Sequence, residues 1–316
     1  MKTVLFQREF LRFQGGHLKV WHYFNHVRAA PGFEAVVRFR PDTVWDDSNP
    51  WLPVRDEVLS WEDPVDPDVL FVAGRDWRWL DPLQREESPV PVVNLLQHVL
   101  HAAPDDPLAR HRFLPNKAIR ICTSFEIARA IEETGRVRGP DFTIPNGIDL
   151  VELDAVPRPA QRDIELLIVA AKQPVLGRRL AQRLASSAPE LVLLRHYEAR
   201  PELLARIAQA RVTVFLPNPR EGVYIPGLEG MALGTLVVCP DCVGNRSYCE
   251  GGRNCLMPAY DEDAIAAAAE RALASGFERD PFVVAGRAAA RDHRLEAERD
   301  AFVSVLDRLG ELWESA

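Results

Sequence analysis

The chain has 316 residues, of which 47% are apolar and 27% charged, a composition typical of a globular protein large enough for two domains. No apolar run approaches the roughly 20 residues needed to cross a bilayer, and the N-terminus lacks a long apolar segment with a small-residue cleavage site, so we expect a cytoplasmic protein. The net charge of −8 disfavours a general basic surface for nucleic acid.

The first predicted elements are a strand at residues 4–7 and a helix that ends near residue 27, joined through Gly15 and Gly16. A strand, a Gly pair and a helix can bring the main chain against a phosphate or a sugar, although a plain turn uses the same pair. Basic residues nearby are typical of a solvated helix face, and the alternative is contact with phosphate or with lipid headgroups at the inner face of a membrane. These residues are Arg8, Arg12, Lys19 and Arg28.

An acidic segment at residues 42–68 follows a second predicted strand at 33–39 and contains Trp45, Trp51 and Trp61. A tryptophan ring packs well on the C–H face of a pyranose, so this segment could contact an acceptor sugar. The more common role of such tryptophans is to anchor an irregular surface segment.

Two apolar strands, at 68–73 and 89–97, are each followed by polar residues at the carboxyl end, where open α/β sheets bind ligands. Asp76 follows the first strand and is a candidate carboxylate for the acceptor. His98 follows the second, with His101 as the alternative. A lone histidine after an apolar strand is otherwise commonly a structural residue.

The first domain is predicted to end with a strand at 119–123, a helix capped by Ser124 and a strand at 141–144. The Pro-Asn-Gly turn at 145–147 then leads into a second domain and is the expected hinge. There, an apolar strand at 164–171 places Lys172 at its carboxyl end, and a helix from about residue 176 carries Arg178. The remaining predicted elements are a strand at 191–195 and helices at 201–209, 261–275 and 287–313, the last a single long amphipathic helix.

Residues 211–258 carry the strongest functional signal. A strand at 212–216 leads into a loop with Glu221, and a helix from about residue 226 carries Glu229 one turn in. Free N–H groups at a helix N-terminus favour an anion, and Gly222 lets it approach the main chain. Because a carboxylate repels phosphate, we interpret both glutamates as acceptors for neutral hydroxyls on either side of a diphosphate. A nucleotide sugar has this arrangement.

These residues resemble a known family. Glu221 and Glu229 are separated by seven residues, like the E-x7-E motif of the retaining GT-B glycosyltransferases of the family 4 type. FTIPNGID at 142–149 is similar to the interdomain signature of that family, and RICTSFEIARAI at 120–131 to its strand and helix before the linker. Gly15 and Gly16 resemble its N-terminal Gly-Gly loop.

The resemblance implies a GT-B fold, in which two Rossmann-like α/β domains face each other across a cleft, and the repeated alternation of strands and helices agrees with it. The domains would be an acceptor domain at 1–145, a nucleotide-sugar domain at 146–285 and a C-terminal helix at 286–316 that crosses back. Neither a G-x-G-x-x-G nor a Walker motif is present, which disfavours NAD-dependent and P-loop enzymes.

The resemblance also implies an activity, the transfer of a hexose from a UDP- or GDP-sugar to an acceptor hydroxyl. The pathway would be synthesis of a polysaccharide, glycolipid or glycoconjugate, with anomeric retention and with no metal or other cofactor. Two alternatives are a GT-B sugar-nucleotide epimerase and a catalytically silent nucleotide-sugar-binding protein. The sequence does not identify the base, the sugar, the acceptor, the linkage or the oligomeric state.

Particular residues inherit roles from this family. Glu221 would orient the donor sugar, Glu229 would bind the ribose and His98 would reach the donor sugar. The usual Arg and Lys that neutralise the diphosphate are displaced here, so Lys172 and Arg178 would replace them, with Arg179 as the alternative. The main-chain contacts to the donor would come from Gly15, Gly16, Gly222, Val223, Tyr224 and Ile225.

The five cysteines are an odd number, which favours reduced thiols. Cys239 and Cys242 have the spacing of half a zinc site, but Cys249 and Cys255 are six apart, which does not complete it. We expect no metal here, only small thiols that pack a strand end and a loop.

Overall fold

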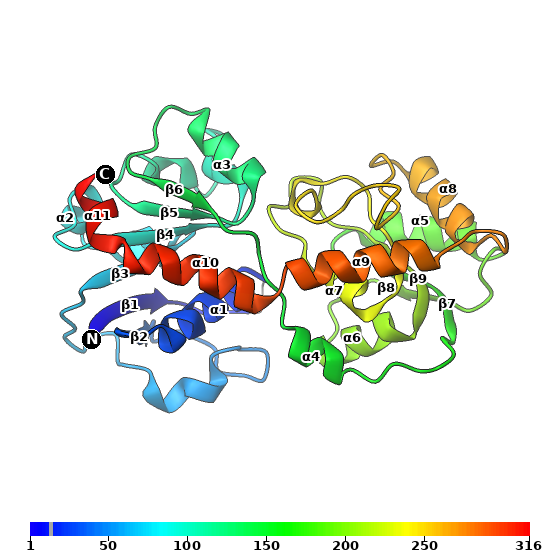
Figure 1. The fold of residues 1–316 in the computed structure, drawn as a ribbon, viewed down its shortest axis with the longest axis horizontal. Helices are drawn as coiled ribbons and strands as arrows, with labels where there is room; N and C mark the ends of the chain where they lie inside the picture. The colour runs from blue at the N-terminus through cyan, green and yellow to red at the C-terminus, as the bar shows by residue number, and fades with distance from the viewer. Residues whose placement is uncertain (13–14) are drawn as a thin grey trace. The chain divides into compact units, whose positions relative to one another are not determined.

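The computed structural model describes residues 1–12 and 15–316 (Figure 1). The chain forms two compact units. Unit 1 contains residues 1–146 and 298–316, and unit 2 contains residues 147–297. Both termini therefore belong to unit 1. Among the described residues, no helix has the length and apolar character to cross a membrane.

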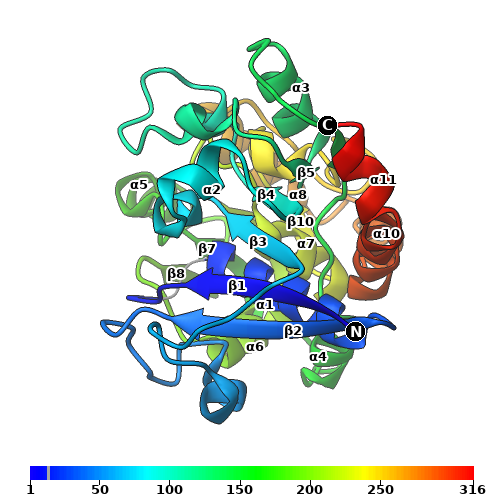
Figure 2. The same ribbon diagram turned by 90° about the vertical axis from the view of Figure 1, so that its left-hand side faces the viewer.

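Unit 1 is built on a parallel sheet of six strands in the order β2-β1-β3-β4-β5-β6 (Figure 2). Apolar residues fill both faces of the sheet, as a parallel sheet covered by helices requires. Val4 and Phe6 face one core and Leu5 faces the other. The strands are β1 (Lys2–Arg8), β2 (Phe33–Phe39), β3 (Val69–Ala73), β4 (Val92–Leu96), β5 (Ile119–Cys122) and β6 (Asp141–Thr143).

Helices cover the sheet of unit 1. The first core packs against α1 and the C-terminal helices, and the other face packs against η2 and α3, whose N-terminus is capped by the Ser124 hydroxyl as predicted. The helices are α1 (Gly15–Ala29), η1 (Leu52–Glu57), η2 (Asp76–Trp79), α2 (Pro82–Glu86), η3 (Val99–His101), η4 (Arg110–Phe113), α3 (Phe125–Glu132), α10 (Leu295–Asp307) and α11 (Leu309–Glu314).

Unit 2 repeats this plan with a four-stranded parallel sheet in the order β10-β9-β7-β8. One core lies between the sheet and α4, α6, α7 and α9, and the other between the sheet and α5 and α8. The strands are β7 (Ile164–Val169), β8 (Leu191–Leu194), β9 (Ala210–Phe215) and β10 (Leu236–Val238). The helices are α4 (Leu150–Ala155), α5 (Pro174–Leu184), α6 (Arg200–Gln209), α7 (Ile225–Leu233), η5 (Val243–Asn245), α8 (Glu262–Leu273) and α9 (Asp280–Asp292).

The single helix predicted at 287–313 is wrong. α9 ends at Asp292, and α10 and α11 follow as separate helices. The break occurs because the backbone around residue 294 pairs with Ile148, whose N–H donates to the His293 carbonyl at 2.8 Å and whose carbonyl accepts from the Leu295 N–H at 3.0 Å. The chain accordingly returns to unit 1 at Glu298, not at residue 286.

The solvated helix face expected from the basic residues near the N-terminus is also wrong in part. Lys19 is buried and its Nζ lies 2.6 Å from Glu298 Oε2, while His26 Nε2 lies 3.0 Å from Glu298 Oε1. Arg8 is buried as well. These charges are therefore not free to contact a lipid headgroup. They instead hold the C-terminal segment and the strand ends in place within unit 1.

Candidate functional site

In an open α/β sheet, ligands bind at the carboxyl edge of the strands. The site lies between two neighbouring strands whose connections to the next strand lead to opposite sides of the sheet. In unit 2 this point lies between β7 and β9, because β7 connects outward to β8 and β9 outward to β10. Lys172 follows β7, and the loop that carries Glu221 follows β9. Residues 49 positions apart in the sequence are therefore brought together at one edge of the sheet.

Lys172 and Glu221 form an ion pair across this point, through Lys172 Nζ and Glu221 Oε1. The second carboxylate oxygen of Glu221 accepts the Asn218 N–H at 3.2 Å, and the Lys172 ammonium lies 5.3 Å from the centre of the Tyr224 ring. The two side chains are 26% and 15% exposed. The pair is thus fixed by its neighbours but open to solvent, so an anion could reach the ammonium.

The N-terminus of α7 lies directly after this loop. The Tyr224 N–H, which we expected to face a diphosphate, instead donates to the Gly244 carbonyl at 3.1 Å. Within the described residues the N–H groups of Val223 and Ile225 donate no hydrogen bond. Amides without partners at the start of a nine-residue helix carry a partial positive charge that favours an anion such as phosphate.

A close packing of loops holds this segment in place. Added to Gly244, a Cβ would lie 2.7 Å from the Val223 nitrogen and 2.8 Å from the Glu221 carbonyl oxygen, so only glycine fits there. The Tyr248 hydroxyl donates to the Tyr224 carbonyl, and this ring also leaves no room for a side chain at Gly227. Neither contact could be predicted, because no spacing in the sequence pairs residues 221–227 with 244–248.

Glu229 is almost fully buried, and its Oε1 accepts from Arg200 Nη1 at 2.6 Å. Arg200 also donates to both carboxylate oxygens of Glu152, at 2.8 and 2.7 Å. Burial by itself would lower the pKa of Arg200, but the two carboxylates raise it above its ordinary value. Sequence reasoning missed Arg200 and Glu152. Glu229 thus has one oxygen fixed by a cation, and it lies on α7 beyond the Glu221 loop.

Arg178 is exposed on the second turn of α5, which begins at Pro174. The alternative, Arg179, forms an ion pair with Glu262 at 2.6 Å. Arg178 forms no ion pair among the residues that the structure describes. Of the two, Arg178 is therefore the cation left available on this helix, although the structure gives it no contact with Lys172 or Glu221.

In unit 1 the corresponding point lies between β1 and β3. Arg8, at the end of β1, forms an ion pair with Asp76, and its Nη2 lies 3.1 Å from His17 Nδ1. Arg78 and Glu9 form a second pair between the same two strand ends. Burial raises the pKa of Asp76 although Arg8 opposes the shift, and burial next to Arg8 lowers the pKa of His17 to about 3.

The other residues predicted in unit 1 lie at the same edge. α1 begins at Gly15, and Gln97 Nε2 donates to the Gly16 carbonyl at 3.4 Å. His98 is half-buried, and its Nδ1 accepts the Leu100 N–H at 3.2 Å. Burial lowers the pKa of His101 to about 3. His101 is therefore a neutral core residue, and of these two histidines His98 is the one with access to solvent.

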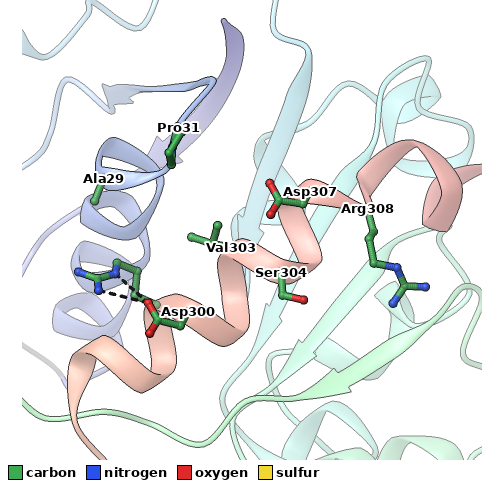
Figure 3. Close-up of a pocket in the computed structure, with 8 residues that line it drawn as sticks. Ala29, Pro31, Asp300, Val303, Ser304, Asp307 and Arg308 are labelled. Atoms are coloured by element: carbon green, nitrogen blue, oxygen red, sulfur yellow. Dashed lines mark hydrogen bonds and ion pairs between the residues drawn. The ribbon is translucent and has the colours of Figure 1, made fainter.

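A surface groove of about 530 Å³ lies between the C-terminal end of α1 and α10 (Figure 3). Ala29 and Pro31 line it just before β2 begins, together with charged residues of α10 such as Asp300. The groove is thus at the amino edge of the sheet, opposite the predicted site residues. We do not include it in the candidate site.

The described cysteines are all buried and reduced. The Asn245 amide nitrogen lies 3.2 Å from Cys239 Sγ, and the described residues contain no group of three or more metal-ligating side chains placed to hold an ion. The thiols of Cys239, Cys242, Cys249 and Cys255 pack into the core beneath α7.

Two parallel-sheet α/β units, with charged residues at the carboxyl edge of each sheet, define the GT-B class of architecture. Residues 144–275 match the family model for glycosyl transferases group 1. No curated protein matches the chain. The match covers the part of the chain that contains Lys172, Glu221 and Glu229, and the chain is a glycosyltransferase.

Solved structures share the fold along nearly the whole chain. Sucrose-phosphate synthase from Thermosynechococcus elongatus has a TM-score of 0.70 at 14% identity, with 98% of this chain and 100% of that chain covered. Anabaena HepE in complex with UDP and glucose has a TM-score of 0.76 at 12% identity, with the same coverage. HepE in complex with UDP-glucose has a TM-score of 0.74 at 14% identity, again with that coverage.

Proposed function

We propose that the protein transfers a hexose from a nucleotide-diphosphate sugar to an acceptor hydroxyl with retention of anomeric configuration, without a metal ion or other cofactor. The observation that carries the proposal is the ion pair of Lys172 with Glu221, which lies at the carboxyl edge of unit 2 beside the free amides of α7. A UDP-sugar is the first donor to test, because the HepE structures contain UDP with glucose and UDP-glucose. A GDP-sugar is the second.

In this proposal the donor replaces the partners of both charged groups. The diphosphate attracts the Lys172 ammonium, and the N–H groups of Val223 and Ile225 donate to its oxygens. Glu221 is then released to accept hydrogen bonds from hydroxyls of the donor sugar. An exchange of this kind costs little, because each charge leaves one partner for another and the pair is already partly solvated.

Glu229 would bind the ribose through its second oxygen. Arg200 donates to the first oxygen, which fixes the orientation of the carboxylate. A hydroxyl that donates to a charged oxygen forms a stronger hydrogen bond than one to a neutral group. The ribose contact would therefore contribute to donor affinity more than to the chemical step.

The chemistry that remains is departure of the diphosphate from the anomeric carbon. Negative charge grows on the leaving oxygen, and in this proposal Lys172, Arg178 and the α7 amides stabilise it. The leaving phosphate would accept the proton of the attacking hydroxyl on the same face of the sugar, which gives retention. His98 would contact the donor sugar from unit 1, and Gly15 and Gly16 would supply main-chain contacts.

The experiment is incubation with UDP-glucose and GDP-mannose, with and without a panel of sugar acceptors, while the free nucleotide diphosphate is measured. We expect release that depends on the acceptor, and NMR of the product should show the anomeric configuration of the donor. Acceptor-independent consumption of the donor would favour an epimerase. Tight donor binding without any turnover would indicate a silent binding protein, and a product of inverted configuration would contradict the retaining mechanism.

A further inference from the structure

A ladder of alternating guanidinium groups and tryptophan rings lies in unit 1. Arg40 is placed over both Trp61 and Trp79, with its central carbon 5.1 and 4.8 Å from the two ring centres. Arg38 lies 5.0 Å from the Trp61 ring, and Arg78 lies 4.1 Å from the Trp79 ring. The two rings meet edge to face at 5.8 Å. We call these five residues the Arg-Trp ladder.

The ladder lies at the carboxyl edge of the sheet. Arg38 is near the end of β2 and Arg40 directly follows it, so the two lie on one face of an extended segment. Arg78 and Trp79 belong to η2, which follows β3. This is the edge at which parallel sheets bind ligands, and it is where Asp76 and His98 also lie.

The ring faces in the ladder are already covered by cations, so they are not open to the face of a sugar. Trp51, another tryptophan considered for an acceptor, is fully buried, and Trp45 packs against Phe39. These contacts agree with the more common of the two roles considered, in which such tryptophans anchor an irregular segment, rather than with bare rings presented to a pyranose. What the ladder offers to a ligand is the outer edge of its guanidinium groups.

Arg40 is the cation of the Arg-Trp ladder whose charge is least compensated by neighbouring groups. Arg78 pairs with Glu9, and Arg38 donates to the Trp61 carbonyl at 3.3 Å. Among the described residues the Arg40 guanidinium group makes no hydrogen bond, and the Asp42 carboxylate lies 3.9 Å from its Nε. Its side chain is 34% exposed, so its terminal nitrogens can be reached from solvent.

The inner nitrogens of the ladder are left unpaired. Nε of Arg38, Arg40 and Arg78 and Nε1 of Trp79 are buried without a hydrogen-bond partner in the described part of the chain. A folded protein rarely keeps several such donors in one cluster. Packing between the two rings restricts the Arg40 side chain, so less conformational entropy is lost when its guanidinium group binds an anion.

We propose that Arg40, held between Trp61 and Trp79, binds a carboxylate or a phosphate group carried by the acceptor. A guanidinium group fits the paired oxygens of either anion, whereas a neutral sugar would leave the charge of this partly exposed cation uncompensated. The inference rests on the proposed function, because the acceptor is defined by it. It adds that the acceptor is anionic, a sugar acid or a phosphorylated sugar.

The test is calorimetric titration of the full chain with glucose, glucuronate and glucose 6-phosphate, in the wild type and in Arg40→Gln. We expect the anionic sugars to bind about tenfold more tightly than glucose, and we expect Arg40→Gln to remove that preference, since one charge-assisted contact is worth roughly that factor. The tighter of the two anions identifies a carboxylate or a phosphate as the preferred group.

Two variants serve as controls. Arg129→Gln removes an exposed cation of unit 1 that pairs with Glu133, and Arg183→Gln removes an exposed cation of unit 2 that pairs with Asp263, so both should keep the anion preference. If Arg40→Gln fails to fold, Trp79→Phe tests the same contact by loosening the stack. Equal affinity for the three sugars in the wild type, or a preference that survives in Arg40→Gln, overturns the inference. A failure of both UDP-glucose and GDP-mannose to bind would instead refute the proposed function, with the anion preference still measurable.

Discussion

The two units carry an ion pair at the same topological position and differ in how it is held. In unit 2 Lys172 and Glu221 are partly exposed and lie beside amides without partners. In unit 1 the side chain of Arg8 is only 6% exposed, it pairs with Asp76 and contacts His17, and a second pair of charges bridges the same strands. One arrangement can open for a ligand, whereas the other fastens the strand ends together. The topological position shows where in the sheet a site can form. The burial of the charged side chains then distinguishes an ion pair that can bind a ligand from one that stabilises the fold.

The largest effect should follow from Lys172→Gln. Loss of a cation aimed at a leaving diphosphate typically lowers kcat by about 10² to 10³. Stability should change little, because the pair is partly exposed. Donor turnover and the thermal midpoint are the measurements, with Arg183→Gln on α5, the helix that follows Lys172, as the matched control, since it breaks only the exposed pair with Asp263. A variant with wild-type turnover would move the diphosphate contact elsewhere.

Asp76→Asn in unit 1 should lower stability and leave donor binding unchanged, the reverse of the effect expected for Lys172→Gln. Removal of one charge leaves Arg8 buried and unpaired, a change that costs about 3 to 5 kcal/mol in buried pairs, and less here because Asp76 is 15% exposed. Chemical denaturation should report the loss, and donor affinity should remain that of the wild type. Unchanged stability together with lost activity would make this pair catalytic and remove the distinction between the units.

Arg200→Gln tests the role of Glu229 in unit 2. Without Arg200 the buried Glu229 carboxylate loses the partner that fixes its orientation and compensates its charge, so the ribose contact should weaken and the donor KM should rise by about tenfold. We expect kcat to change much less. Arg200→Lys should restore part of the affinity because it keeps a positive charge near Glu229. An effect on kcat alone, with the donor KM unaltered, would argue against a ribose-binding role.

Much of the fold follows from sequence. Continuous apolar runs predicted the strands of both parallel sheets, and Ser124 was recognised as a helix cap. The break at residues 293–294 could not be predicted, because it depends on pairing with Ile148, far away in the chain. The periodicity of the sequence reports only the amphipathic pattern, and this pattern continues across the break.

Less of the site could be predicted. Lys172 and Glu221 were identified from their places after two strands and from a family motif, and the structure brings them into contact. The pairing of Arg8 with Asp76 joins residues 68 positions apart, and no local pattern encodes it. Arg200 gave no signal either, because its partners lie on two other helices.

A smaller, pH-dependent effect should come from Glu298, which joins the C-terminal segment to unit 1. Burial by itself would raise its pKa, but the charge of Lys19 and the hydrogen bond with His26 lower it to about 2. A carboxyl with a lowered pKa stabilises the folded state above its unfolded pKa of 4.5, and that stability is lost as the pH falls from there to about 2. Denaturation midpoints between pH 6 and about 2 should fall more steeply for the wild type than for Glu298→Gln. Parallel curves would contradict this role.

The most direct test of the central claim is a crystal structure of the protein with bound UDP-glucose. The account predicts that the Lys172–Glu221 pair is separated, with the ammonium on the diphosphate, the Glu221 carboxylate on sugar hydroxyls and the Arg8–Asp76 pair intact. A structure in which Lys172 remains bound to Glu221 while the nucleotide occupies another part of the chain would contradict it.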